Sequence, residues 1–535
     1  MLASKILVDV PEDSGVHVKT AGKKGEKYVY KYVEYFRNSA GAPRNRARSI
    51  GKFDPGTGKM HPNSRYYEIY NIETTLPDIS IFDYGYAYLA LKVCRDTGLL
   101  ECLMQAFGAR GAMEIAVMAS YIVREGNAMD AIDDWQERNY FPGFDRRLTS
   151  QSTSRAFASI TNAQTDCFFR HWVKRAYSGG SVCYDVTSIS SYSSGMASVE
   201  RGYNRDGDDL CQYNLGMFCD EGTKAPLYYS RYNGSLTDRT NLPYVLASAR
   251  SLGIKHVKMI VDGGFWREEC FKSLAGCCDS FTMGMPAFLK ESGEIISKYA
   301  GGIEKYANEL DCRHVYCVEL EATIYGVPGK VLLFYDSWNH LNLSEELSNR
   351  IERLKAELAA LKRFPKGKLG RYTPYFTITE HEKGNGFDYA VDTRKVDELR
   401  GKKGFFLLFS TEMEAAPSDI LYYYRAKDAD EKIFSQIKVD MDGGRARTHN
   451  EGTTDGKTFV TFIACAIRSD MFGKMSKFLK ENSTSMKKAL NQMSNITIVS
   501  SSEGLRFTKA LTKKQKQILS AFNAEDDIMK SIDPV

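Results

Sequence analysis

The feature that most constrains this chain is a switch in the spacing of its apolar residues near residue 180. Across residues 84–176, apolar positions recur three and four residues apart, which is the spacing of one face of an α-helix. From residue 181 onward, the runs SVCYDVTSIS, LCQYNLGMFCD and APLYYSRYN are typical of strands. A helix over about residues 238–252 then precedes the strand-like run HVKMIVDGGF. This order predicts a helical bundle followed by a mixed α/β sheet.

The two ends of the chain are more basic than its middle. Residues 17–49 have a net charge of +7 and residues 471–520 a net charge of +8, against +5 for all 535 residues. Clustered positive charge favours nucleic acid as a partner, although solvated lysine-rich surfaces give the same pattern. The N-terminal part, residues 1–83, reads as short strands and turns. Three of its arginines alternate and would share one face of an extended strand: Arg44, Arg46 and Arg48.

The region after the predicted sheet looks like an insertion. Residues 290–412 combine several strand-like runs with one long amphipathic helix, in which Asn342 and Glu345 predict a capping box. Helical spacing returns over residues 416–438, with Ser418 as the candidate N-cap, and continues to the end of the chain. We therefore expect a mainly β insertion with one long helix, followed by a helical C-terminal region.

Composition and missing motifs exclude several classes of function. Apolar residues make up 43% and charged residues 26% of the chain, as in globular proteins, and no run of 18 apolar residues predicts a membrane span. The first residues do not read as a secretory signal, so the 12 cysteines are expected to be reduced thiols in a cytoplasm. No Walker-type phosphate loop and no paired CxxC motif occurs, which argues against ATP and structural zinc. Carboxylate chemistry with Mg²⁺ or Mn²⁺ is the best remaining candidate.

Two aspartates stand in the predicted sheet at positions where aspartate is unusual. Asp185 lies inside a strand pattern, and Asp262 closes the apolar run VKMIV before two glycines. A buried carboxylate is costly unless it is hydrogen-bonded or binds a cation, and sites in open α/β sheets gather at the carboxyl ends of strands. The alternative is that both residues are strand-end caps or turn formers.

A helix carries the third candidate acid. Tyr424, Lys427, Glu431 and Lys438 follow one another at spacings that place them on one helical face. The simpler interpretation is a solvated ion-pair ladder, which Lys427 and Glu431 fit. Alternatively, the carboxylate completes a metal site while the tyrosine and the lysines face phosphates.

These residues together resemble the DDE transposases of bacterial and archaeal insertion sequences. One branch carries the signature Y-x2-R-x3-E-x6-K, which reads here as Tyr424, Lys427, Glu431 and Lys438, with Lys427 in place of the arginine. That replacement keeps the charge but loses the bidentate fork. The runs YDVTSIS and IVDGGF are similar to the strands of the first two acids, and RSIGKFDPGTGKMHPN is similar to the N-terminal hairpin of this branch.

The resemblance implies a ribonuclease-H-like catalytic core, with Asp185 on its first strand, Asp262 after its fourth and Glu431 on a helix beyond the insertion. These acids would hold two Mg²⁺ or Mn²⁺ ions for cleavage at transposon ends and strand transfer, without ATP. The implied division of the chain is a β-rich basic region (1–83), a helical DNA-binding region (84–178), the first part of the core (179–289), the insertion (290–412), the second part of the core (413–456) and a basic helical region (457–535).

The resemblance also implies the partners. Double-stranded DNA, as terminal inverted repeats and as target, would bind a homodimer, and the setting would be a prokaryotic cytoplasm near the nucleoid. A nuclease of the same fold without strand transfer, and a non-catalytic or domesticated DNA-binding protein, remain the alternatives. The predicted DNA contacts are Tyr424, Lys427, Lys438, Arg44, Arg46, Arg48 and Trp266. For Trp266, the prediction is stacking on a flipped base, and the alternative is packing in the core.

Overall fold

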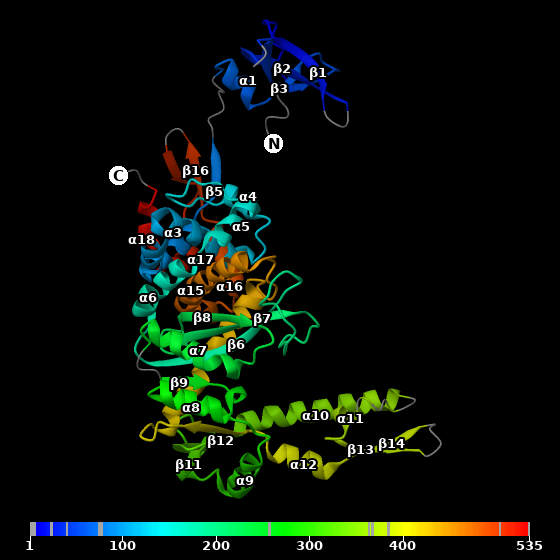
Figure 1. The fold of residues 1–535 in the computed structure, drawn as a ribbon, viewed down its shortest axis with the longest axis vertical. Helices are drawn as coiled ribbons and strands as arrows, with labels where there is room; N and C mark the ends of the chain where they lie inside the picture. The colour runs from blue at the N-terminus through cyan, green and yellow to red at the C-terminus, as the bar shows by residue number, and fades with distance from the viewer. Residues whose placement is uncertain are drawn as a thin grey trace. The chain divides into compact units, whose positions relative to one another are not determined.

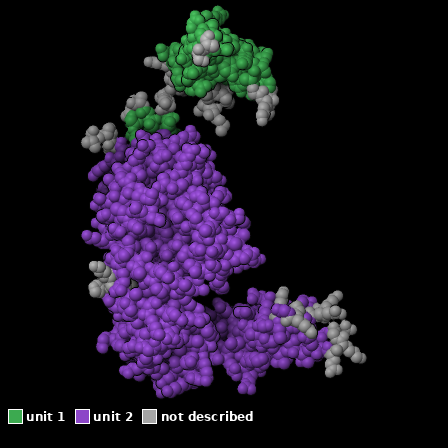
Figure 2. All heavy atoms as spheres, in the orientation of Figure 1, with its two compact units in different colours: residues 1–81, 499–506, 534–535 green, residues 82–498, 507–533 purple. Residues whose placement is uncertain are grey.

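A computed structural model describes most of the chain, and it divides into two compact units. The described residues are 7–21, 25–38, 41–72, 79–254, 258–361, 364, 367, 369–381, 386–501 and 504–532. Unit 1 contains Met1–Ile81, Val499–Arg506 and Pro534–Val535, and unit 2 contains Phe82–Ile498 and Phe507–Asp533. Figure 2 colours the two units.

Unit 1 is built on an antiparallel sheet with the order β1-β2-β3-β4. A short helix, α1 (Ser64–Ile69), follows the sheet, and Val29, Ile50 and Met60 form its small core. The long strands agree with the aromatic and β-branched residues of KYVYKYVEYF. The strands are β1 (Val16–Ala21), β2 (Glu26–Arg37), β3 (Pro43–Phe53) and β4 (Met60–Pro62).

The helical spacing of residues 84–176 corresponds to five helices at the start of unit 2. A long buried helix from near the end of the chain, α15 (Glu451–Glu481), packs against α2, α3 and α5 (Figure 1). Thr149 and Thr161 begin α5 and α6 with capping boxes. The five helices are α2 (Gly85–Asp96), α3 (Leu99–Glu125), α4 (Ile132–Arg138), α5 (Ser150–Ser159) and α6 (Asn162–Ala176).

Helix α3 has the length and composition of a membrane-spanning helix, and within the described part of the chain it is alone in this. Its apolar window is 61% buried, and the helix contacts α2, α6 and α15. Gly108, at φ 69°, interrupts it with a kink. These contacts are those of a core helix in a globular unit.

A mixed eight-stranded sheet forms the centre of unit 2, in the order β11-β12-β15-β10-β9-β6-β7-β8. The pairs β6·β9 and β9·β10 are parallel, and the other pairs are antiparallel. The fold is therefore the mixed α/β multidomain arrangement that the switch in spacing predicts. The strands are β6 (Ser181–Ser190), β7 (Gln212–Asp220), β8 (Pro226–Asn233), β9 (Lys258–Val261), β10 (Ser280–Met285), β11 (Val315–Ile324), β12 (Val327–Asp336) and β15 (Phe405–Ser410).

Two sets of helices accompany this sheet. The crossover helices α7 (Asp238–Ser251) and α8 (Glu268–Cys277) pack together, and α8 contacts β10. After β15, the chain continues through α13 (Pro417–Ala426), α14 (Asp428–Ser435) and a π-helical turn, η6 (Gln436–Asp440). Helix α14 packs against β6 and β7. Pro417 occupies the first turn of α13 after Ala416, so the predicted N-cap Ser418 is wrong by two residues.

The expectation of a mainly β insertion is wrong. Strands β11, β12 and β15 extend the central sheet, and the remainder is mostly helical with its own core, in which Leu347, Ile351 and Leu354 of α10 pack against Phe376. Figure 1 shows α10 beside the hairpin β13–β14. The insertion also holds α9 (Lys290–Tyr299), η3 (Ala300–Gly302), η4 (Tyr306–Asn308), α10 (Ser337–Ala360), α11 (Leu369–Tyr372), β13 (Phe376–Glu380), β14 (Phe387–Val391) and α12 (Thr393–Gly401).

The long helix of the insertion also begins earlier than its sequence pattern indicates. Asp336, not Asn342, is the N-cap of α10, and its side chain accepts a hydrogen bond from the backbone of Asn339. The chain therefore passes directly from β12 into α10, and the last residue of the strand is also the cap of the helix.

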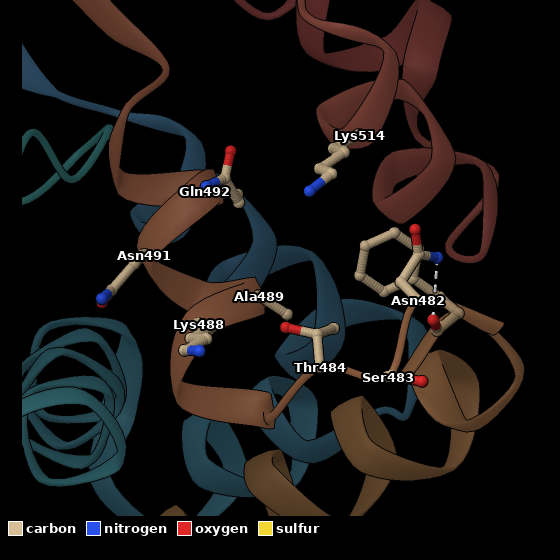
Figure 3. Close-up of a pocket in the computed structure, with 9 residues that line it drawn as sticks. Asn482, Ser483, Thr484, Lys488, Ala489, Asn491, Gln492 and Lys514 are labelled. Carbon is tan, nitrogen blue, oxygen red and sulfur yellow. Dashed lines mark hydrogen bonds between the residues drawn. The ribbon is translucent and has the colours of Figure 1, made fainter. Parts of the chain in front are cut away.

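The C-terminal region is mainly helical. A small sheet has the order β17-β16-β5. A cavity of about 340 Å³ lies among α15, α16 and α17, and Figure 3 shows Lys488 of α16 and Lys514 of α17 among its polar lining residues. The elements here are α16 (Met486–Ser494), α17 (Lys513–Ser520), α18 (Glu525–Lys530), β5 (Ser80–Asp83), β16 (Thr497–Ser501) and β17 (Gly504–Phe507).

Candidate active site

The two predicted aspartates meet at one cavity of unit 2. Strands β6 and β9 are parallel neighbours in which Val182 is opposite Met259 and Cys183 is opposite Ile260. This register, continued by two residues, places Asp185 beside Asp262. Both residues line a cavity of about 630 Å³. Parallel pairing of the two strands therefore brings together acids that are 77 positions apart in the sequence.

Asp185 carries the cost of a largely buried carboxylate. Its strand neighbours Tyr184 and Val186 are buried, and its own side chain accepts a 2.9 Å hydrogen bond from the backbone of Val186. Burial raises the pKa of Asp185, Asp262 raises it further, and the charge of Lys427 opposes the shift. The site therefore disfavours the charged form of Asp185 unless a nearby cation compensates for it.

Asp262 has two roles in the structure. Its side chain is the cap of the 3₁₀ turn η2 (Gly263–Phe265) and accepts a hydrogen bond from the backbone of Gly264. Its other oxygen lies 3.4 Å from Nζ of Lys427. The prediction of a strand-end cap therefore accounts for the contact of one Asp262 oxygen with Gly264. It does not account for the ion pair between the other oxygen and the buried Lys427.

Lys427 and Tyr424 reach this region from the end of α13. Lys427 is 7% exposed, at the residue between α13 and α14. Tyr424 lies against β10, where a Cβ on Gly284 would be 2.5 Å from the tyrosine hydroxyl. Gly284 therefore leaves the space that this hydroxyl occupies, close to Gly263 in the turn after Asp262.

Glu431 lies on α14, which packs against β6, the strand of Asp185. Its side chain is outside those that the structure describes. Within the described part of the chain, no three His, Cys, Asp or Glu residues form a group able to hold a metal ion. Asp238 also lines the cavity but pairs with Arg205, whereas Asp185 and Asp262 supply the hard oxygen donors that Mg²⁺ or Mn²⁺ prefers. The donor chemistry of these two acids therefore fits such ions.

The remaining predicted contacts of unit 2 lie around the cavity without lining it. Lys438 pairs with Asp206 at 2.6 Å. Trp266 is partly buried and makes edge-to-face contacts with Phe271 and Phe409 in the apolar core. These contacts agree with the alternative stated for Trp266, which is packing in the core.

The three predicted arginine contacts lie in unit 1. Strand β3 is continuous over them, so alternate residues share one face, and all three are exposed. Arg46 pairs with Glu34 at 2.9 Å and lies over the ring of Phe36. The arginines in question are Arg44, Arg46 and Arg48.

The cavity that Asp185 and Asp262 line, which we call the acid cavity, also has three lining residues that sequence reasoning missed. Tyr203 is 82% exposed, Arg205 pairs with Asp238, and Nε of Arg239 donates a 2.6 Å hydrogen bond to the carbonyl of Gly264. Two of them are in a turn-rich loop before β7 and one begins α7. No residue spacing in the sequence singles out these three.

No protein-family model matches the chain, and no curated protein is detectably similar in sequence. Among solved structures, a cryo-EM structure of the piggyBac transposase synaptic complex with hairpin DNA is a distant neighbour, with a TM-score of 0.34 and 12% sequence identity. That match covers 81% of this chain and 72% of the other. Similarity at this level assigns neither a family nor a function.

Proposed function

We propose that this protein is a DNA transposase of the DDE type, which cleaves transposon ends and joins them to target DNA. The observation that carries the proposal is the placement of Asp185 and Asp262. They are side by side by strand register, line one cavity and are accompanied by a buried lysine. Glu431 is proposed as the third acid because its helix packs against the strand of Asp185.

The strand arrangement supports a ribonuclease-H-like core. Among the five strands β6–β10, Asp185 is on the first and Asp262 follows the fourth, which are the positions that the transposase resemblance implies. The helix of Glu431 comes after a segment of more than one hundred residues, in accordance with an insertion between the second and third acids. The branch with the Y-x2-R-x3-E-x6-K signature is part of this proposal.

The proposed chemistry depends on the negative charge of the two acids and on the metal cations that they would bind. Two Mg²⁺ or Mn²⁺ ions, when bound by carboxylates, supply an activated oxygen nucleophile and stabilise the leaving 3′-oxygen. Asp185 and Asp262 would bind them, and the raised pKa of Asp185 means that a bound cation would relieve an unfavourable negative charge. No step requires ATP.

Three cationic side chains around the acids suit a phosphodiester backbone. Arg205 and Arg239 line the cavity, and Lys427 is beside Asp262. We propose that they orient the phosphate so that its reacting bond points at the two acids, because charge-assisted hydrogen bonds fix both position and direction. Tyr424 and Lys438 are proposed to contact the strand near the cleaved end.

The wider assignments belong to the same proposal. Double-stranded DNA is the partner, a homodimer on paired ends is the active form, and the exposed arginines of β3 contact the DNA backbone. The setting is a prokaryotic cytoplasm. A nuclease without strand transfer and a non-catalytic DNA-binding protein differ from this proposal in what happens after DNA binds.

The test is a cleavage and joining assay on the DNA that flanks the reading frame, with Mg²⁺ and a supercoiled target. We expect cuts at the ends of short inverted repeats, followed by joined products, and expect Asp262→Asn to remove both while retaining DNA binding. Asp311→Asn, at an exposed aspartate outside the acid cavity, is the matched control. Cuts without joining would identify a nuclease, and binding without cuts would identify a non-catalytic protein.

A further inference from the structure

A second cavity, which we call the basic cavity, is lined in part by the α13–η6 segment. It has a volume of about 300 Å³ and shares no lining residue with the acid cavity. Arg425 comes from α13, Lys432 and Ile433 from α14, and Gln436 from η6.

The charged groups of the basic cavity are all positive. Lys224, Arg425 and Lys432 line it, and none of its described lining residues carries a carboxylate. Lys224 pairs with Glu221 at 3.3 Å and Arg425 with Asp336 at 2.8 Å, outside the cavity lining. The side chains of Lys224 and Arg425 are still 43% and 46% exposed, and a guanidinium has five donors. The cavity is therefore suited to an anion.

One wall of the basic cavity is apolar and open. Ile433 is buried there, whereas Phe472 of α15 is 41% exposed. Gly473 beside it has no heavy atom within 4 Å of where a Cβ would lie. An exposed aromatic ring in a cavity lining with open space is a surface on which a planar ring can stack.

The third feature is a buried amide without a partner. Gln436 lines the basic cavity, is 9% exposed, and its Oε1 has no hydrogen-bond partner among the described residues. It is also the first residue of the π-helical turn η6, and such turns are frequent at functional sites. A buried acceptor of this kind is satisfied by a ligand that offers a hydrogen-bond donor.

We propose that the basic cavity binds one nucleotide. The base stacks on Phe472, a donor on its edge satisfies Oε1 of Gln436, and its phosphate contacts Lys224, Arg425 and Lys432. The volume is at the lower end for small-molecule sites and suits a ligand of that size. A free mononucleotide and an unpaired nucleotide of a DNA strand share this chemistry. The inference stands apart from the proposed function, because it uses no residue of the acid cavity.

The first test measures binding of a fluorescent ribose-labelled adenosine monophosphate (mant-AMP), whose adenine keeps its amino donor, to the full chain by anisotropy. Gly473→Leu fills the open space at this position of α15. No heavy atom lies within 4 Å of where its Cβ would be, so the variant is expected to fold. We expect it to weaken binding at least tenfold. Gly293→Leu, at an equally open glycine of α9, is the matched control and should bind as the wild type does. Gln436→Leu should weaken binding of the base-containing probe and leave the affinity for inorganic phosphate unchanged.

Two results would overturn the proposal. One is equal probe binding by the wild type and Gly473→Leu. The other is displacement of the probe by inorganic phosphate as effectively as by adenosine monophosphate, because the cavity would then recognise only an anion.

A second arm distinguishes the two sources of the nucleotide. If the source is DNA, Gly473→Leu should bind a duplex with a single-stranded 5′ tail less tightly than the wild type does, with blunt duplex unchanged. If the source is a free nucleotide, both duplexes should bind equally and only the mononucleotide should lose affinity. Loss of neither refutes the proposal. Metal-dependent cleavage of blunt duplex by the same variant, measured in parallel, reports on the acid cavity.

Discussion

The acid cavity and the basic cavity differ in how their residues come together. In the acid cavity, two neighbouring parallel strands bring Asp185 and Asp262 side by side. In the basic cavity, Lys224 comes from the turn between β7 and β8, Arg425 and Lys432 from the α13–α14 segment, and Phe472 from α15. Strand register makes the first site visible in the sequence. The second depends on the packing of three distant segments, and local spacing carries no trace of that.

The largest expected effect concerns the acids themselves. Asp185→Ala, Asp262→Ala and Glu431→Ala should each lower metal-dependent DNA cleavage by more than about 100-fold, because loss of a metal ligand costs more than loss of its supporting partners. A gel assay of cleavage alongside a binding assay separates chemistry from DNA affinity. Strong residual cleavage by any one variant would remove that residue from the site.

The next two predictions compare two buried lysines, Lys457 and Lys427. Lys457 of α15 is 5% exposed and donates a 3.2 Å hydrogen bond to the carbonyl of Ala446. Burial lowers its pKa to about 8, the charge of Arg447 adds to the shift, and Asp442 opposes it. The unfolded chain therefore binds more protons between pH 8 and the ordinary lysine pKa of 10.5, so stability should rise across that window.

Chemical denaturation of Lys457→Met against the wild type measures this contribution. At pH 7 the variant should be more stable by up to about 3 kcal/mol, since one pKa unit corresponds to roughly 1.4 kcal/mol. The advantage should shrink as the pH rises above 8. An advantage that is independent of pH would show that Lys457 is not the titrating group.

Lys427 should behave in the opposite way, because its neighbours are carboxylates. Lys427→Met should lower the free energy of unfolding without metal by about 1–3 kcal/mol, since Asp262 and Asp185 lose their nearby positive charge. Lys427→Arg, which keeps the charge, should recover most of the loss. Added Mg²⁺ should narrow the difference between Lys427→Met and the wild type in thermal unfolding. No destabilisation by Lys427→Met would mean that the ion pair contributes nothing.

The smallest expected effect tests the apolar wall of the basic cavity. Phe472→Ala should weaken mant-AMP binding by about fivefold or more, because stacking of one base on an aromatic ring contributes about 1–3 kcal/mol. Phe288→Ala, at a phenylalanine that is 88% exposed elsewhere, is the control. Equal affinity in the two variants would place the base away from Phe472.

Much of the fold was predictable because each element has a local signal. Alternation at 181–190 and helical spacing at 238–252 correspond to β6 and α7 within a residue or two. The insertion was mispredicted because a run such as KVLLFYD specifies a strand but not its sheet. Only the pairing of β12 with β15 and β11 shows that these strands extend the core.

The candidate site was predictable to a similar extent. Asp185 and Asp262 could be singled out because an aspartate in or after an apolar strand is costly. Arg205, Arg239 and Tyr203 could not, because arginine and tyrosine in a loop or at a helix start are ordinary there. Lys427 fitted an ion-pair ladder along its helix equally well, and its placement beside Asp262 depends on how α13 packs against the sheet.

The most direct test of the central claim is whether Glu431 joins the two aspartates at one metal site. Fe²⁺ substituted for Mg²⁺, with added ascorbate and hydrogen peroxide, generates hydroxyl radicals that cut the polypeptide near the bound ion. In the full chain bound to DNA, we predict cuts in three segments, around 185, 262 and 431, that excess Mg²⁺ suppresses together. Cuts at the first two segments with none near 431, or a pattern that Mg²⁺ does not suppress, would contradict a three-carboxylate site.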